Sequence, residues 1–391
     1  MTNTYDAILI GGGIMGCCTA HELGQRGLSV AVLEKGRIGD GPTGDSVAII
    51  RQHYSNRLTA RMAHYGVRVF HEFEDRIGES CGFHQSGFVV LTSESNRTGL
   101  ESNLALQREI GIDTRIISSE DLSDLVPEMN PQPDLIAAFE SESGYADACL
   151  TVKAYANSVK RQGADLFEDT EVTDIYFSGE RVSGVRTPSG DFQAPVVINC
   201  AGAWGARIAA MTGHVIPIES CRAQVAVVSK PKGFRSEFPV VIDFSNGSYI
   251  RPHSRESIFG GLVDPTEANA VVDPDNYKKS ADADFLDNVS DRLAETWHGL
   301  NESDSVGGYA SLYAITPDWH PIVDEVPADS GFYICSGFSG HGFKLAPAVG
   351  QMTADMILEE SNPLFDHRAF RLSRFDENDS VMGIYKFSIL G

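Results

Sequence analysis

The opening of the chain alternates between short apolar runs and one amphipathic stretch. The run Ala7–Ile10 is continuously apolar and predicts a buried strand, and Gly11–Gly16 predicts a tight turn. The pattern then predicts a helix over Cys17–Arg26 and a second strand over Ser29–Glu34. A strand, a tight turn, a helix and a further strand in this order form a βαβ unit, which is typical of parallel sheets in α/β proteins.

The pattern changes after this unit. A loop rich in glycine, proline and aspartate covers Gly39–Asp45, and a long helix is predicted over Arg57–Ile77. Between residues 82 and 148, short apolar runs such as Gly87–Leu91 are mixed with one predicted helix, and turn residues become more frequent. We therefore predict that a second domain begins in this part of the chain.

Later segments return to the first pattern and then depart from it again. A helix is predicted over Leu150–Gln162. Three predicted strands follow it: Glu171–Tyr176, Arg181–Thr187 and Val196–Cys200. Longer alternating strands within Cys221–Phe259 are typical of an antiparallel sheet, and a final glycine-rich turn precedes a helix predicted over Pro347–Glu359.

This order of elements indicates two interleaved domains of an α/β and an α+β type. We predict a discontinuous, Rossmann-type nucleotide-binding domain made of residues 1–84, 150–215 and 310–391. We predict a substrate domain, built on an antiparallel sheet, made of residues 85–149 and 216–309.

Charge and composition narrow the range of functions. The 391 residues carry 54 acidic and 31 basic side chains, a formal charge of −23, which repels nucleic acid and anionic lipid. The seven cysteines include no C-x-x-C pair, and the eleven histidines show no metal-ligand spacing, so we predict buried thiols and no metal site. No apolar run approaches the ~18 residues of a membrane span. We expect a cytoplasmic protein that binds neither nucleic acid nor membrane.

The glycine-rich turn has the G-x-G-x-x-G spacing of a dinucleotide site. Gly11, Gly13 and Gly16 allow a tight turn, a close approach to a pyrophosphate and close packing of helix on strand. Glu34 ends the second strand, where a carboxylate can bind the ribose hydroxyls. We assign to the cofactor site Gly11, Gly13, Ile14, Met15, Gly16, Glu34 and Lys35. This motif does not distinguish NAD from FAD.

Three further segments carry more specific information: Val196–Gly205 (VVINCAGAWG), Leu312–Asp318 (LYAITPD) and Gly337–Lys344 (GFSGHGFK). The first ends in Ala-Gly, so its backbone can pass close to a flat ligand. The last leaves bare amides before a helix, which suits hydrogen bonds to a ring that gains negative charge. Ser339 and His341 do not form a hydrolase nucleophile elbow, because the motif needs glycine where His341 stands.

Together with the N-terminal turn, these segments resemble the D-amino-acid oxidase superfamily of flavoproteins. The resemblance runs along nearly the whole chain. It is strongest to the branch of sarcosine oxidases, dimethylglycine dehydrogenases and catalytic subunits of proline dehydrogenases. It implies FAD as the cofactor and a substrate sheet above the flavin. It adds these residues to the cofactor site: Ser46, Val172, Ala201, Gly202, Trp204, Gly337, Phe338, Ser339, Gly340, His341, Gly342, Phe343 and Lys344.

Four residues are candidates for the chemistry: Arg51, Lys344, Tyr249 and His341. Arg51 follows the apolar segment Val47–Ile50, which would hold its guanidinium near the flavin, and its fork suits a carboxylate. In the sarcosine oxidase pattern, the matching arginine and lysine bind the substrate's carboxylate, and Tyr249 matches an active-site tyrosine. The alternatives are surface roles for Arg51 and Lys344 and a core role for Tyr249.

The chain departs from the family pattern at three places. Ser311 stands where a cysteine carries the flavin in monomeric sarcosine oxidase, and Gly39–Ser46 lacks the family's attachment histidine, so we expect noncovalent FAD. Residues 233–277 contain no lysine, whereas some relatives place a lysine over the flavin to promote reaction with oxygen. Rapid oxidase activity is therefore not expected.

The resemblance implies oxidation of the C–N bond of a small carboxylate-bearing amine, by hydride transfer to flavin N5 to give an imine. Sarcosine, dimethylglycine, N-methyl amino acids, proline and pipecolate are all candidate substrates. Two alternatives stay open. The chain could be a flavin-bearing electron-transfer subunit of a larger complex, with additional subunits or a separate electron acceptor, or it could be an NAD-linked dehydrogenase.

Overall fold

The computed structural model describes residues 3–130, 132, 134–263, 270–300, 303, 305–362 and 364–383. Two large sheets dominate it. The six-stranded sheet contains, in spatial order, β19 (Ile322–Glu325), β20 (Phe332–Ser336), β13 (Val196–Asn199), β2 (Ala7–Ile10), β3 (Val30–Leu33) and β9 (Asp165–Phe167). The eight-stranded sheet contains β18 (Ser305–Ile315), β14 (Glu219–Ser229), β17 (Ser257–Leu262), β16 (Ser248–Pro252), β15 (Val240–Asp243), β5 (Phe88–Ser93), β7 (Leu135–Glu140) and β6 (Thr114–Ile117).

Smaller sheets and helices complete the fold. A four-stranded sheet contains β1 (Asn3–Thr4), β12 (Gly190–Gln193), β11 (Arg181–Thr187) and β10 (Asp174–Ser178), and β4 (Ile49–Ile50) pairs with β8 (Gly144–Tyr145). The α-helices are α1 (Ile14–Gln25), α2 (Arg57–His71), α3 (Phe73–Ile77), α4 (Arg97–Ile110), α5 (Ser119–Leu125), α6 (Ala148–Arg161), α7 (Gly205–Ala210), α8 (Ala283–Thr296) and α9 (Gly342–Ile357). Short 3-10 helices cover Glu94–Asn96, Gly202–Trp204, His367–Phe370 and Leu372–Phe375.

The six-stranded sheet is parallel except at β19, which runs antiparallel to β20. All four residues of β2 are buried, because α1, α6 and α9 lie on one side of the sheet while α7 and the four-stranded sheet supply side chains to the core on the other. Burial on both faces explains why Ala7–Ile10 is apolar throughout rather than alternating. The predicted βαβ unit and the Rossmann-type fold class are confirmed.

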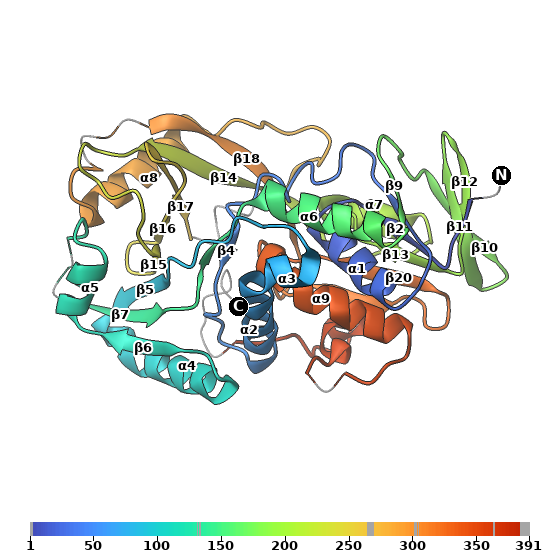
Figure 1. Ribbon diagram of the computed structural model, residues 1–391, viewed down its shortest axis with the longest axis horizontal. Helices are drawn as coiled ribbons and strands as arrows, with labels where there is room; N and C mark the ends of the chain where they lie inside the picture. Colours follow the sequence, from blue (N-terminus) through green and yellow to red (C-terminus); the bar gives the residue numbers. More distant parts are fainter. Residues whose placement is uncertain are drawn as a thin grey trace.

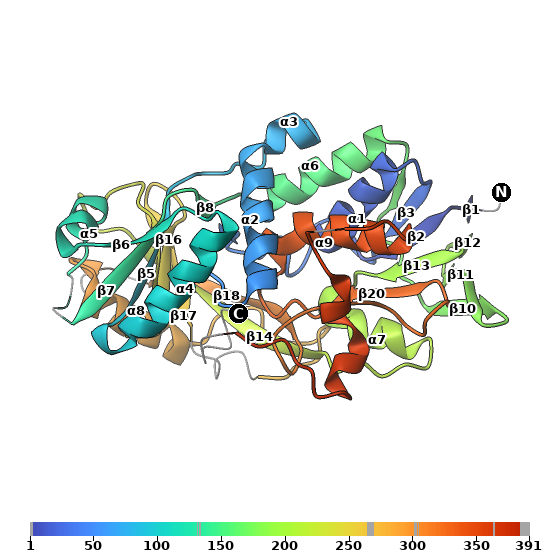
Figure 2. The same ribbon diagram turned by 90° about the horizontal axis from the view of Figure 1, so that it is seen from below.

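The eight-stranded sheet is antiparallel at every neighbouring pair except β15 and β5, which run parallel. Helix α8 covers one face with Phe285, Val289 and Leu293. In Figures 1 and 2, this sheet with α4, α5 and α8 occupies the left of the view, the six-stranded sheet with α1 and α6 the right, and α2 lies between them. The division of the chain into the two domains at the residues given above stays a prediction.

Several predicted helix boundaries were wrong. The helix of the βαβ unit begins at Ile14 rather than Cys17, because Gly13 already has the extended backbone of an N-cap. The predicted helix Arg57–Ile77 is divided at Glu72, which places the rings of Phe70 and Phe73 in the core with centroids 5.8 Å apart.

The wrong start of α9 matters most for the site. Helix α9 begins at Gly342, so Pro347 lies inside the helix rather than at its start. A proline is expected at the first helical position, and that expectation misplaced the boundary. As a result Lys344 lies in the first turn of α9.

Within the described residues, no helix combines the length and apolar character needed to cross a bilayer.

Candidate active site

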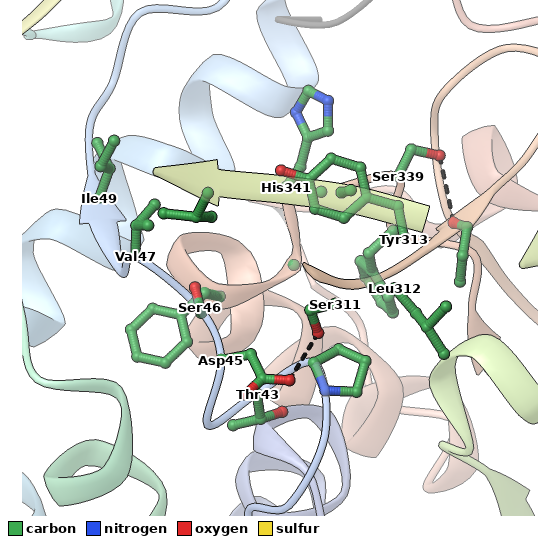
Figure 3. A pocket seen from close by; sticks show the side chains of 18 of the residues that line it. Thr43, Asp45, Ser46, Val47, Ile49, Ser311, Leu312, Tyr313, Ser339 and His341 are labelled. Atoms are coloured by element: carbon green, nitrogen blue, oxygen red, sulfur yellow. Dashed lines mark hydrogen bonds between the residues drawn. The ribbon is translucent and has the colours of Figure 1, made fainter. Parts of the chain in front are cut away.

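A cavity of about 260 Å³ lies between the two large sheets. One wall comes from the start of α1 and the loop after β3, where Thr43, Asp45 and Ser46 are found. The eight-stranded sheet and the segment before α9 form the rest. Figure 3 shows Ser46, Val47 and Ile49 on the left and Leu312, Tyr313 and Ser339 on the right, and below them Asp45 is hydrogen-bonded to Ser311.

The structure brings many of the predicted site residues to this cavity. Those that line it are Ile14, Met15, Ser46, Arg51, Gly202, Tyr249, Phe338, Ser339, Gly340, His341, Gly342, Phe343 and Lys344. Others lie nearby in the chain, at the turn before α1 or next to the lining residues: Gly11, Gly13, Gly16, Glu34, Ala201 and Gly337. Val172 differs, because it is buried in the core between the six-stranded and four-stranded sheets.

The turn before α1 requires its glycines. A Cβ on Gly11 would lie 2.6 Å from the Cys200 carbonyl oxygen, and one on Gly16 would lie 1.9 Å from the Gly11 carbonyl oxygen. The Glu34 carboxylate accepts hydrogen bonds from the Gly12 amide at 2.7 Å and the Gly36 amide at 2.8 Å. An ionised carboxylate has further lone pairs, so Glu34 can also accept from hydroxyl groups. The turn has the geometry that a dinucleotide pyrophosphate requires.

Two helices begin at the cavity. Ile14 and Met15 belong to the first turn of α1, and Gly342 and Phe343 belong to the first turn of α9. Helix N-termini present free amides and a partial positive charge, which suit phosphate groups and an electron-rich ring. A Cβ on Gly342 would come within 3.0 Å of Met15 and Phe338, so bulk is excluded there as well. The residues present therefore fit a dinucleotide with a flat ring.

Two buried cations lie on the same cavity. Arg51 is 3% exposed and Lys344 is 7% exposed. The Arg51 guanidinium lies 4.3 Å from the ring centroid of Tyr54, and the Lys344 ammonium lies 5.9 Å from it. The pKa of Lys344 lies well below its usual value, first because the ammonium is buried and second because the like charge of Arg51 is close. In the part of the chain that the structure describes, neither cation forms an ion pair with an acidic side chain.

Tyr54 joins this group, although the sequence interpretation did not select it. Its hydroxyl shares a hydrogen bond of 3.2 Å with His341 Nδ1. Burial raises the pKa of Tyr54 to about 12, so the phenol stays neutral at physiological pH. Its position three residues after Arg51, in an apolar and aromatic stretch, was the available signal. The ring gives both cations an electron-rich face in place of a carboxylate.

A buried acid from a distant strand holds the segment that carries Arg51. Arg51 donates a hydrogen bond to the carbonyl oxygen of His53. Glu140, on β7, accepts from the Gln52 amide at 3.0 Å and from the Ser143 hydroxyl at 2.8 Å, and it lies 3.4 Å from His53 Nδ1. Glu140 is 1% exposed. No local pattern links it to Arg51, so sequence reasoning missed it.

The eight-stranded sheet supplies the opposite wall. Tyr249 on β16 faces Gly261 on β17, where a Cβ would lie 2.3 Å from the tyrosine ring. Burial raises the pKa of Tyr249 well above its usual value, so this phenol is also neutral. Ser311 donates a hydrogen bond of 2.8 Å to the Asp45 carboxylate (Figure 3). The Tyr309 hydroxyl donates to the Asp45 carbonyl oxygen at 2.8 Å. These bonds fix the loop after β3 against β18.

Lys35 and Trp204 lie at the surface rather than at the cavity. Both contact Asp275, from the segment between β17 and α8: the Lys35 ammonium at 2.7 Å and the Trp204 indole nitrogen at 2.8 Å. Arg207 binds the same carboxylate at 2.5 Å, and the Lys35 ammonium lies 3.8 Å from the Trp204 ring centroid. We call these four residues the Asp275 clasp. It was not predicted, because its acid comes from the predicted substrate domain.

Comparisons with known proteins agree with this geometry. The profile of the family described as DAO, FAD dependent oxidoreductase, matches residues 6–356. The chain is 27% identical to sarcosine oxidase subunit beta of Rhodobacter capsulatus over 384 residues, which cover 96% of this chain and 90% of that one. It is 27% identical to mitochondrial sarcosine dehydrogenase of Homo sapiens over 390 residues, but spans only 42% of that protein's length.

A solved structure matches over the full length. The crystal structure of L-proline dehydrogenase from P. horikoshii superposes with a TM-score of 0.89 and 30% sequence identity. The match covers 97% of this chain and 100% of that one. The likeness of the fold therefore extends over both large sheets.

Proposed function

The chain belongs to the family of FAD-dependent oxidoreductases, and on that premise we propose that it oxidises the C–N bond of a small secondary or tertiary amine that carries a carboxylate. The observation that carries the proposal is the pair of buried cations, Arg51 and Lys344, which line the cavity and have no acidic partner among the described residues. Buried charges of one sign are unfavourable unless an anion pairs with them. The carboxylate of the substrate is that anion.

FAD, when bound, would supply the redox chemistry by accepting a hydride equivalent from the carbon beside the amine nitrogen, which leaves an iminium ion, or an imine where a secondary amine then loses its N–H proton. The turn Gly11–Gly16 and the start of α1 would hold its pyrophosphate, and Glu34 its ribose hydroxyls. The first amides of α9 would face its ring.

The chain's own residues bind and orient the amine. Arg51 offers a planar fork for both carboxylate oxygens, and Lys344 adds a point charge. The same two charges disfavour a protonated amine beside them, so the substrate is bound with its nitrogen uncharged, as the oxidation requires. The neutral phenol of Tyr249 bounds the space, and His341, which also lines it, shares a hydrogen bond with the Tyr54 hydroxyl. Orientation of this kind can supply a large part of a rate enhancement.

An anaerobic screen of the purified protein tests the proposal. Secondary and tertiary amines with a carboxylate, including sarcosine, dimethylglycine, proline and pipecolate, are added and the flavin absorbance is followed. We expect bleaching by at least one of them and none by its decarboxylated analogue. Equal bleaching by both would contradict the role of the carboxylate. If no amine reduces the flavin without a partner protein, the alternative of an electron-transfer subunit in a larger complex takes its place.

We further propose that the FAD is noncovalent. Ser311 has a hydroxyl rather than a thiol, that hydroxyl is bonded to Asp45, and the loop 39–46 contains no histidine. Acid precipitation should therefore release the yellow colour into the supernatant, and colour in the pellet would contradict this assignment.

Because residues 233–277 contain no lysine, we propose a dye or quinone rather than oxygen as the better electron acceptor.

A further inference from the structure

A third buried arginine, Arg251, lies on the sheet that forms one wall of the cavity. Strand β16 covers Ser248–Pro252, and side chains two residues apart on a strand point to the same face. Arg251 therefore shares its face with Tyr249, which lines the cavity. Arg251 is 7% exposed.

Two aromatic rings flank this guanidinium. Its central carbon lies 4.5 Å from the ring centroid of Tyr145 and 4.9 Å from that of Phe259. Phe259 is the cross-strand partner of Arg251 on β17. Tyr145 is the cross-strand partner of Ile49, which lines the cavity and is labelled in Figure 3. Arg251 is thus close to the strand that leads into Arg51, but on the other side of Tyr145.

The guanidinium of Arg251 has no anionic partner within the described ranges. Its Nε has no hydrogen-bond partner, and no aspartate or glutamate of those residues forms an ion pair with it. Asp147, which acts on it electrostatically, instead accepts the Leu150 amide at 2.8 Å as the cap of α6. Burial lowers the pKa of Arg251 to about 10, so the group is still charged at neutral pH. Rings that stack on a guanidinium cover its faces, and its N–H edge stays available to a carboxylate.

We propose that Arg251 binds a second carboxylate of the substrate, so that the preferred substrate is an amine with two carboxylates. One carboxylate is held by Arg51 and Lys344, and the other by the edge of Arg251, beside Tyr145 and Tyr249. The class includes secondary amines with a carboxylate on each side of the nitrogen and cyclic amines with two carboxylates. This inference rests on the proposed function, because it adds to the cavity a second subsite that lies directly behind the wall formed by Tyr249 and Ile49.

Matched substrate pairs test this inference. The pairs are N-methylglycine with N-(carboxymethyl)glycine, and proline with pyrrolidine-2,5-dicarboxylate, and anaerobic flavin reduction is measured with the holoenzyme. In at least one pair we expect the dicarboxylate to have the higher kcat/KM, by about tenfold or more, as a buried charge pair commonly provides. In Arg251→Gln the ratio of dicarboxylate to monocarboxylate kcat/KM should fall at least about tenfold. Arg255→Gln, which removes an exposed arginine near the same strand, should leave the ratio unchanged.

Other outcomes separate this inference from the function on which it rests. Reduction by the monocarboxylates with no preference for the dicarboxylates overturns the second subsite alone. An equal loss on both members of a pair in Arg251→Gln assigns the arginine a purely structural role and also overturns it. If neither these pairs nor the other carboxylate-bearing amines of the anaerobic screen reduce the flavin, the proposed function and the second subsite fail together.

A binding measurement is independent of whether Arg251→Gln folds. Glutarate should perturb the flavin spectrum of the unmodified protein at a concentration about tenfold lower than butyrate. Arg251→Lys, which keeps the charge but not the fork, should show a smaller difference between the two acids. Equal affinities for glutarate and butyrate in the unmodified protein would overturn the proposal.

Discussion

Arg374 and Arg51 are both buried, but their surroundings differ. Arg374, near the end of the described chain, is fully buried and donates to both oxygens of Asp318 at 2.8 and 3.0 Å. It also donates to the carbonyl oxygens of Phe370, Arg371 and His320. Arg51 donates to one carbonyl oxygen and faces a cavity. A charge that the fold neutralises internally holds the chain together, whereas a charge directed at a cavity is available for a ligand.

The largest effect that we expect is on stability, at Arg374. Arg374→Ala leaves the Asp318 carboxylate buried without its partner, and breaking a buried pair in this way costs about 3–5 kcal/mol. The free energy of unfolding in urea should fall by this amount. Arg368→Ala, which removes an exposed arginine paired with Asp366, is the matched control and should change little. A small effect at Arg374 would remove the contrast with Arg51.

Arg51→Ala should have the opposite profile. Because Arg51 has no acidic partner to leave behind, the free energy of unfolding should change little or rise. On a carboxylate-bearing amine, the loss of transition-state stabilisation should be ~2–5 kcal/mol, so kcat/KM should fall roughly thirtyfold or more. Arg51→Lys should also lose activity, because an ammonium cannot replace the fork.

Two controls accompany Arg51→Ala. FAD content should stay near that of the parent, because the turn before α1 and Glu34, rather than Arg51, would hold its pyrophosphate and ribose. The decarboxylated analogue should show a much smaller loss than the amine with its carboxylate. Equal losses on both compounds would mean that Arg51 does not recognise the carboxylate.

Lys344 sharpens the comparison through pH. Its pKa in the folded protein is well below the ordinary value of ~10.4, because of burial first and Arg51 second. The free-energy cost of the charged form is therefore fully present below the folded pKa and is relieved as pH rises from there toward the unfolded pKa. Across that window the stability should rise with pH, and Lys344→Met should abolish this rise. Lys153→Met, at an exposed lysine, is the control.

The affinity of the same lysine for a carboxylate ligand should depend on pH in the opposite direction. A carboxylate favours charged Lys344, so the affinity for acetate should fall as pH rises through the folded pKa, and binding above it should take up a proton. Flavin difference spectra at several pH values, with calorimetry in two buffers of different ionisation enthalpy, measure both effects. An affinity that is independent of pH would show that Lys344 does not titrate in contact with the ligand.

The smallest effect is expected at the Asp275 clasp. Its charged pairs are half exposed, and pairs of this kind contribute at most about 1 kcal/mol each. Lys35 directly follows Glu34, which would hold the ribose hydroxyls, so Asp275→Ala should increase the rate of FAD release a few-fold, measured by the recovery of flavin fluorescence on dilution. Asp287→Ala, at an exposed residue of α8, should have no effect. An unchanged release rate in Asp275→Ala would show that the clasp does not retain the cofactor.

The parts of the fold with a local signal were predicted from the sequence. The βαβ unit follows from a period of apolar residues and a glycine spacing, and both confer structure within a few residues. Arg51 and Lys344 were expected at one site through the resemblance, and the structure brings both to one cavity. Whether they bind a carboxylate stays a prediction.

The parts that depend on distant partners were not predicted. Glu140 reaches the Arg51 segment from β7, and Asp275 reaches Lys35 from the segment before α8. Neither acid differs locally from a surface acid, because its role depends on strand register and packing across long separations. The start of α9 was misplaced for a local reason, because proline is common at the first position of a helix but Pro347 lies inside this one.

The order of strands in the six-stranded sheet has a consequence for how the chain folds during its synthesis. Strands β2 and β3 are made first, but β13, which pairs with β2, and β20, the next strand beyond it, follow much later, and α9 packs against α1. The first strands are therefore synthesised long before their partners leave the ribosome, and such non-local pairing folds slowly. We expect the nascent chain to need protection of these apolar strands during translation and to acquire its cofactor only after α9 has emerged.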